Sequence, residues 1–309
     1  VSGPRLAIAL AQQGGISIIH KNQSVIDQVN GVIEVKKSMS EIINYPVTLN
    51  KNDSIEQAIS AMNKYGISGI LVVDGTILVG ILTSRDIEHN LKFTRDVEPA
   101  GKGSSLKVLI KDVMTKDVVS CNRKDISNAE EIMYNHRIEK LPIITDYGQL
   151  CGLITMKDIH KKRQYPNACV DGNGSLVVGA AVGVGDENST RVNKLIEAGV
   201  DIIAVDTAHG DSKGVIDTIY LIKNLHPGIV IMAGNVATIP GAQRLADAGV
   251  DIIKIGVGPG SICTTRIVAG VGVPQLSAVY DIAKFMKRSP RYSNVKLVAD
   301  GGIRYSGDV

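Results

Sequence analysis

The stretch GVGPGSICTTRIVAGVG, residues 256–272, places Cys263 in a glycine-rich loop. Glycine loses more conformational freedom on folding than any other residue, so such a loop is usually shaped for a tight turn or for close approach to a ligand. A cysteine there is a candidate nucleophile, which must act as the thiolate. Thr265 adds a hydroxyl two residues later, and Arg266 is the nearest cation. From position alone, a nucleophilic cysteine and a structural cysteine fit this loop equally well.

Polar residues also follow other predicted strands. Short Val- and Ile-rich runs predict strands of a parallel sheet that is buried on both faces. They are LVVGAA from residue 176, IIAVD from 202, IVIMAG from 229, IIKIG from 252 and KLVADG from 296. Asp206 ends the second run, Asn235 follows the third, and Asp300 ends the last. Because active sites of parallel α/β proteins lie at the carboxyl ends of the strands, we expect these side chains to share a site with Cys263.

The strand and helix rhythm predicts an α/β fold, and a (β/α)8 TIM barrel is favoured within that class. No G-x-G-x-x-G motif opens a helix, which argues against a doubly wound dinucleotide-binding sheet. Residues 7–22 predict a further helix, glycine turn and strand. Six strands can be predicted where a barrel needs eight, so the barrel is incomplete in this chain, and the chain alone is expected to be inactive.

An internal repeat interrupts this rhythm. VVDGTILVGILTSRDI at 72–87 resembles IITDYGQLCGLITMKDI at 143–159. Helical patterns at 54–66 and 126–138 precede the two copies, and the strand-like segments YPVTLN and KDVVSC precede those helices. The pattern predicts an inserted α+β domain with two copies of a β-α-β-β-α unit.

Composition excludes several classes of protein. The chain has 309 residues, 44% of them hydrophobic, and a net charge of +3, which predicts a soluble globular protein without nucleic-acid partners. We expect no membrane span and no signal peptide. Four cysteines without a C-x-x-C pair predict a reducing, cytoplasmic location. The first residue is Val1, which suggests a fragment or a processed chain.

Four motifs carry a resemblance to a known family. GVGPGSICTTRIVAGVGVPQ, AVDTAHGDS, AGNVAT and ADGGIRYSGD are similar to those of bacterial inosine-5′-monophosphate (IMP) dehydrogenases, in the IMP dehydrogenase/GMP reductase family. The repeats resemble the CBS pair that this family inserts into its barrel. The resemblance implies a first barrel segment at 1–40, CBS motifs at 41–101 and 112–166, and a continued barrel at 167–309. The family's last barrel units and mobile flap are not matched.

The resemblance implies NAD-dependent oxidation of IMP to XMP, with Cys263 as the nucleophile and Thr265 handling the hydrolytic water. Asp206 would bind the nicotinamide ribose of NAD, and Asn235 would line the same cleft. His209 is expected near the cofactor and not as the general base. The remaining implied residues are Gly256, Val257 and Gly258 for NAD; Ser261, Asp300, Gly301 and Gly302 for IMP; and the carbonyls of Gly258, Gly260 and Cys263 for potassium.

In the repeats, Thr83 with Asp86 and Thr155 with Asp158 have two interpretations. Each pair fits a helix capping box. In CBS modules the same pair contacts an adenine nucleotide, so the resemblance implies an allosteric site for ATP or GTP. It also implies a homotetramer or an octamer.

Two alternatives stay open. GMP reductase shares the cysteine loop but carries out an NADPH-dependent deamination of GMP to IMP. A catalytically inactive nucleotide-binding fragment would also fit this sequence.

Overall fold

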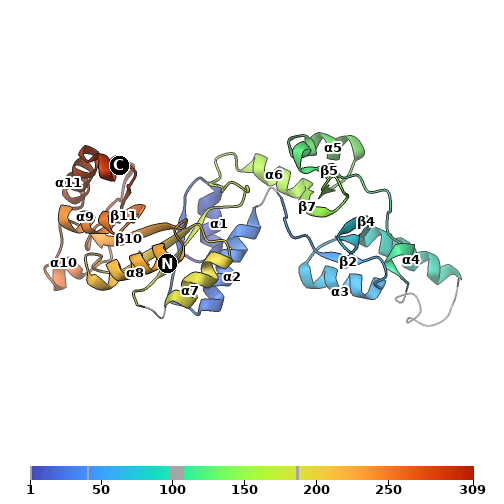
Figure 1. The fold of residues 1–309 in the computed structure, drawn as a ribbon, viewed down its shortest axis with the longest axis horizontal. Coiled ribbons are helices and arrows are strands. Elements are labelled where there is room, and N and C mark those ends of the chain that lie inside the picture. The colour runs from blue at the N-terminus through green and yellow to red at the C-terminus, as the bar shows by residue number, and fades with distance from the viewer. Residues whose placement is uncertain (1, 40–41, 98–107, 186–187) are drawn as a thin grey trace. The chain divides into compact units, whose positions relative to one another are not determined.

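The structure is a computed structural model that describes residues 2–39, 42–97, 108–185 and 188–309 (Figure 1). Among these residues, no helix is both long and apolar enough to cross a membrane. The chain divides into two compact units, and each is described by itself. Unit 1 combines residues 1–39 with 167–309, and unit 2 comprises residues 40–166.

Unit 1 alternates strands with helices. Its first part contains α1 (Pro4–Gln12), β1 (Ser17–Ile19) and α2 (Val25–Ser38). Its second part contains β8 (Val178–Val182), α7 (Asn188–Glu197), β9 (Ile202–Asp206), α8 (Lys213–Leu225), β10 (Val230–Val236), α9 (Ile239–Asp247), β11 (Ile252–Ile255), α10 (Thr265–Val268), α11 (Gln275–Arg288), η4 (Pro290–Tyr292), β12 (Lys296–Ala299) and η5 (Ser306–Asp308).

The strands of unit 1 form one parallel sheet of six strands in the order β1-β8-β9-β10-β11-β12. Spatial order follows chain order, with no point within the described sheet at which it reverses. That order is expected for part of a (β/α)8 barrel and differs from that of a doubly wound sheet. The predicted parallel α/β fold with six strands is therefore confirmed, while closure into an eight-stranded barrel stays a prediction.

Burial along the strands explains their composition. All five residues of β8 are buried, as are the first four of β9. In β11 the pattern alternates, with Ile253 and Ile255 fully buried while Ile252 and Lys254 are partly exposed. One continuous apolar core joins the sheet to its helices. The alternation in β11 frees one face for a polar side chain close to its carboxyl end.

An ion-pair cluster lies where the chain leaves and re-enters unit 1. Nζ of Lys36, in the last turn of α2, lies 2.9 Å from Oδ2 of Asp171 and 2.7 Å from Oδ2 of Asp201. The Asp201 carboxylate also accepts a hydrogen bond from the backbone N–H of Val178, at the start of β8. The cluster therefore ties α2 to the beginning of β8 and β9.

Unit 2 contains two copies of one supersecondary pattern. The first copy consists of β2 (Thr48–Asn50), α3 (Ile55–Tyr65), β3 (Gly69–Asp74), β4 (Ile77–Thr83) and α4 (Ser84–Val97), followed by η2 (Ile110–Asp112). The second consists of β5 (Cys121–Asn122), η3 (Arg123–Asn128), α5 (Ala129–His136), β6 (Lys140–Ile144), β7 (Leu150–Thr155) and α6 (Met156–Gln164).

Each copy has a three-stranded sheet and an apolar cluster of its own. In both, the first strand pairs parallel with the second, which pairs antiparallel with the third. The predicted strand in KDVVSC is wrong for most of its length, because only Cys121 of that segment belongs to β5. The predicted helix at 126–138 is also shorter than expected, since residues up to Asn128 form a 3₁₀ helix.

Candidate active site

The cysteine loop connects β11 to the short helix α10. Cys263 is exposed, and its backbone N–H donates a hydrogen bond of 3.0 Å to the carbonyl of Gly260, which closes a tight turn. Gly256 and Gly258 have φ values of 138° and 68°, a region that residues with a side chain rarely adopt. The loop therefore presents its thiol to solvent on a backbone that needs glycine.

Thr265 lies beside this thiol. Sγ of Cys263 is 3.2 Å from Oγ1 of Thr265. The Thr265 hydroxyl, then its backbone N–H, and to a smaller degree the charge of Arg266 lower the pKa of Cys263. The Arg266 guanidinium is anchored to the loop, because its Nε donates to the carbonyl of Val257 at 3.1 Å. A lowered pKa increases the thiolate fraction at neutral pH, which a nucleophile requires.

Two carboxylates, from the carboxyl ends of β9 and β12, converge on one lysine of the same sheet. Asp206 ends β9, Asp300 follows β12, and Lys254 lies in β11 between them. Nζ of Lys254 is 2.7 Å from Oδ1 of Asp206 and 3.1 Å from Oδ2 of Asp300. Desolvation alone would lower the pKa of Lys254, but its bond to Asp206 and the charge of Asp300 outweigh it and raise the pKa. The lysine is therefore an ammonium ion at neutral pH.

Asn235 joins the carboxylates to the cysteine loop. Its Nδ2 donates to Oδ2 of Asp300 at 2.6 Å and to the carbonyl of Gly256 at 2.7 Å. The loop after β9 lies against the same residue, because the N–H of Asn235 donates to the carbonyl of Thr207 and its own carbonyl accepts from the N–H of Gly210. Asn235 thus fixes the positions of three loops relative to one another.

The Asp-Gly-Gly turn after β12 packs on the cysteine loop. Gly301 and Gly302 both have φ of 83°. A Cβ on Gly301 would lie 3.4 Å from the backbone nitrogen of Gly260, and one on Gly302 would lie 3.3 Å from Pro259. Backbone atoms of the two turns therefore approach closely beside the exposed Ser261. The predicted phosphate contacts of Ser261, Gly301 and Gly302 therefore lie in two turns that touch one another.

The structure thus gathers the predicted residues of unit 1 at the carboxyl ends of β9 to β12. His209 is exposed in the loop after β9 and acts electrostatically on Asp211. For the predicted potassium site, the Gly260 carbonyl keeps a second lone pair beside its bond to Cys263, and the site stays a prediction. The Asp206 carboxylate could accept hydrogen bonds from ribose hydroxyls, and its predicted role stays a prediction.

Three residues of this region were missed by the sequence analysis. Lys254 is the one charged residue in the apolar run IIKIG, and a charge within a predicted buried strand is the feature that could have indicated a functional role. Lys21 donates from its Nζ to the backbone carbonyl of Asp206 at 2.8 Å. Gln275 donates from Nε2 to the carbonyl of Ile255 at 2.8 Å, at the start of the cysteine loop. The contacts of Lys21 and Gln275 join residues that are far apart in the sequence, so no local sequence pattern predicts them.

In unit 2 the two Thr-x-x-Asp pairs form caps. Oγ1 of Thr83 is 2.7 Å from Oδ2 of Asp86, and the Thr83 N–H donates to the same carboxylate at 2.7 Å. The Thr155 hydroxyl bonds to the Asp158 carboxylate and accepts from the Asp158 N–H at 3.4 Å. The capping interpretation is sufficient for the geometry of both pairs, and their nucleotide contacts stay a prediction.

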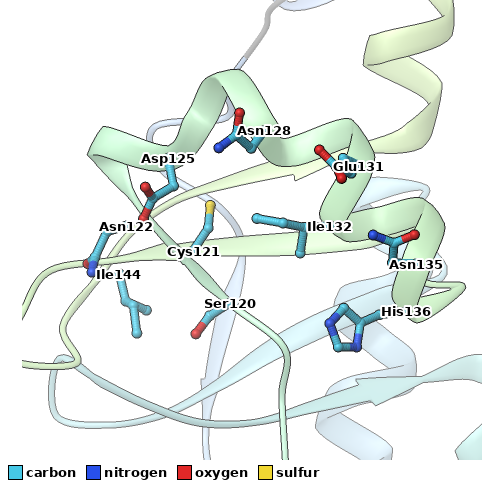
Figure 2. A pocket seen from close by; sticks show the side chains of 10 residues that line it. All are labelled: Ser120, Cys121, Asn122, Asp125, Asn128, Glu131, Ile132, Asn135, His136 and Ile144. Carbon is cyan, nitrogen blue, oxygen red and sulfur yellow. The ribbon is translucent and has the colours of Figure 1, made fainter.

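A pocket of about 400 Å³ in unit 2 lies elsewhere in its second repeat (Figure 2). Figure 2 shows polar side chains that project from η3 and α5 toward the segment around β5. Its lining residues are Ser120, Cys121, Asn122, Asp125, Asn128, Glu131, Ile132, Asn135, His136 and Ile144. They include two carboxylates and no lysine or arginine, so this pocket lacks the cations that usually bind a phosphate.

Comparisons with known proteins identify the family of the chain. Residues 1–309 match the family described as IMP dehydrogenase / GMP reductase domain. Inosine-5′-monophosphate dehydrogenases from Halalkalibacterium halodurans and Aquifex aeolicus are 47% and 48% identical over the whole chain. The chain spans 61% of the length of each.

Solved structures of GMP reductase from Trypanosoma brucei also resemble the chain. The complex with guanosine 5′-triphosphate is 36% identical with a TM-score of 0.80 and covers all of this chain and 72% of its own. A cysteine-to-alanine variant in complex with guanosine 5′-monophosphate is 36% identical with a TM-score of 0.81, covering all of this chain and 63% of its own. With its exposed loop cysteine and its matched sheet, the chain belongs to the IMP dehydrogenase/GMP reductase family.

Proposed function

We propose that the protein is an IMP dehydrogenase, which oxidises IMP to XMP with NAD in guanine nucleotide synthesis. The observation that carries the proposal is the identity of 46–48% with IMP dehydrogenases along the whole chain, cysteine loop included. The exposed Cys263 with a lowered pKa supports it, because the reaction begins with a thiolate.

In this proposal the Cys263 thiolate adds to C2 of the purine of IMP and forms a carbon–sulfur bond. NAD, when bound, supplies the acceptor for the hydride that leaves C2. Water then adds to the resulting thioimidate, and the carbon–sulfur bond breaks to give XMP and the free thiol. Thr265 stands beside Sγ, where it stabilises the thiolate in the first half and orients the water in the second.

The ligand positions in this proposal are those that the family resemblance implies. Asp206 and Asn235 bind the nicotinamide ribose side, with the backbone of Gly256, Val257 and Gly258 alongside. Asp300 binds the IMP ribose, while the remaining contacts hold the phosphate. The phosphate contacts are the hydroxyl of Ser261 and the backbone of Gly301 and Gly302. Potassium is held by the carbonyls of Gly258, Gly260 and Cys263.

Unit 2 serves as a CBS pair that senses ATP or GTP, and the assembled protein is a cytoplasmic homotetramer or octamer. The repeated three-stranded sheets with capped final helices support this assignment. GMP reductase is the second candidate, because two structures of that enzyme match the whole chain with TM-scores of 0.80 and 0.81.

One assay separates the candidates. The natural full-length protein is supplied with IMP and NAD, or with GMP and NADPH, and the reduced dinucleotide is followed by absorbance. We expect NADH formation from IMP, and mass spectrometry of the quenched reaction should find an IMP-derived adduct on Cys263. The Cys263→Ala variant should form neither. NADPH consumption with GMP would establish the reductase instead, and ligand binding without turnover would establish a nucleotide-binding protein.

A further inference from the structure

Lys254 lies in a lateral row that crosses the sheet. Strand pairing places Asp206 of β9 opposite Gly234 of β10, and Gly234 opposite Lys254 of β11. Asp206 and Lys254 are therefore two strands apart, with one glycine between them. A lysine side chain is long enough to span that gap, and its Nζ lies 2.7 Å from Oδ1 of Asp206.

Gly234 leaves the room that this crossing needs. A Cβ at Gly234 would lie 2.7 Å from Cβ of Lys254 and 2.6 Å from its carbonyl oxygen. Any larger residue would displace the lysine or its strand. The strand register and the absence of a side chain at Gly234 thus determine the direction of the Lys254 side chain toward Asp206.

The ammonium group of Lys254 holds both carboxylates at once. It engages Oδ1 of Asp206 and Oδ2 of Asp300, and the lysine side chain is 21% exposed, while the two carboxylates are 44% and 43% exposed. Its bonds leave Oδ2 of Asp206 and Oδ1 of Asp300 as the oxygens that it does not engage. Without the ammonium, two carboxylates close to one another would repel, and their side chains would turn toward solvent.

We propose that Lys254 is a positioning residue shared by two ligand subsites, orienting Asp206 for the dinucleotide ribose and Asp300 for the nucleotide ribose. This inference rests on the proposed function, which assigns those two riboses. It follows that a change at Lys254 weakens binding of both ligands, whereas a change at either aspartate weakens mainly one. The lysine itself need not touch either ligand, since it acts through the carboxylates.

Binding measurements on the natural full-length protein test this without turnover. The Cys263→Ala variant serves as the parent, because it removes the covalent step. Calorimetry gives the dissociation constant of IMP alone and that of NAD at saturating IMP. The same measurements are made after adding Lys254→Met, Lys254→Arg, Asp206→Asn or Asp300→Asn to the parent. Lys223→Met is the matched control, since Lys223 forms a 2.8 Å ion pair with Asp251 away from the cysteine loop.

We expect Lys254→Met to raise both dissociation constants by roughly tenfold to a hundredfold, because a carboxylate that is no longer held in place loses its charge-assisted hydrogen bond to the ribose. Lys254→Arg should restore both to within about threefold, because it keeps the charge. Asp206→Asn should weaken mainly NAD binding, and Asp300→Asn should weaken mainly IMP binding. Adding Asp206→Asn to Lys254→Met should change NAD binding little further, because both changes remove one interaction.

Three results would overturn the shared role: Lys254→Met weakens one ligand only, its effect adds fully to that of Asp206→Asn, or Lys223→Met has the same effect. Thermal unfolding checks that each variant folds, and Lys254→Gln replaces Lys254→Met if the latter does not. If the parent binds neither IMP nor NAD, the proposed function itself fails. Normal binding by the parent with unchanged binding by Lys254→Met contradicts the role of Lys254 alone.

Discussion

The Sγ atom of Cys263 lies 3.2 Å from the hydroxyl oxygen of Thr265, two residues along the chain. A hydroxyl at that distance stabilises the thiolate more than the thiol, so it lowers the pKa of Cys263. Thr265→Val should therefore raise that pKa. The midpoint of the alkylation rate against pH, measured with iodoacetamide and mass spectrometry of the Cys263 peptide, should move to higher pH, and alkylation at neutral pH should slow.

The adjacent Thr264→Val variant is the control for this shift, because the Thr264 side chain caps no helix and Thr265 keeps the contact with sulfur. A midpoint that stays in place in Thr265→Val, or that moves equally in Thr264→Val, would show that the hydroxyl of Thr265 does not set the reactivity of the thiol.

Asp206→Ala should raise KM for the dinucleotide more than KM for IMP. Loss of a hydrogen bond from ribose to a carboxylate weakens binding by roughly tenfold to a hundredfold. Steady-state kinetics on the full-length enzyme measure both constants. Asp211→Ala removes another carboxylate of the same loop, one that pairs with Arg244, and should leave both unchanged. If IMP binding weakens instead, Asp206 belongs to the other subsite.

Gly234→Ala should destabilise unit 1 by about 1–3 kcal/mol, because the new methyl group would overlap the backbone and Cβ of Lys254. Thermal or urea unfolding measures the change. Gly228→Ala is a suitable comparison, since no atom lies within 4 Å of the position that its Cβ would occupy. Equal stability of the two variants would mean that the sheet accommodates a side chain at Gly234.

Lys36→Met should lower the free energy of unfolding by about 3 kcal/mol at neutral pH, because it leaves Asp171 and Asp201 without their largely buried cation. Arg291→Met, which breaks an exposed pair with Asp247, should cost less than about 1 kcal/mol. Urea unfolding of both variants measures the difference, and similar losses would show that burial adds nothing at Lys36.

The same cluster should make unit 1 sensitive to acid. Burial would raise the pKa of Asp171, but the bonds from Lys36 and from the backbone of Asn173 and Ser175 lower it below its usual value of 3.8. The unfolded chain therefore binds protons at a higher pH than the folded chain does. The resulting stability is complete above about pH 5 and is lost as the pH falls through the folded pKa. Lys36→Met should reduce this loss on acidification.

Residues 40–166 should fold when produced alone, because each repeat of unit 2 encloses its own apolar cluster. Thr155→Ala should lower the stability of this unit by about 1 kcal/mol through loss of the helix cap. Calorimetry with ATP and GTP then tests nucleotide binding. Binding that survives in Thr155→Ala would assign that residue to capping alone, and no binding by the unaltered unit would contradict a sensing role.

How far the sequence predicts the site depends on the range of each interaction. The Val- and Ile-rich strands of the sheet, with Asp206 and Asp300 at their ends, follow from local pattern. The contact of Lys254 with Asp206 does not, because it depends on strand register across Gly234. The segment KDVVSC shows that a local pattern can also predict too much. Its β-branched residues suggest a strand, but within this segment only Cys121 pairs with another strand.

The pairing of β1 with β8 has a consequence for synthesis on the ribosome. Ser17 of β1 is opposite Val178 of β8, and all of unit 2 is translated between them. At about 5–20 residues per second, β8 is synthesised roughly 8–30 s after β1. The helices α1 and α2 therefore stay without their sheet until translation has passed β8.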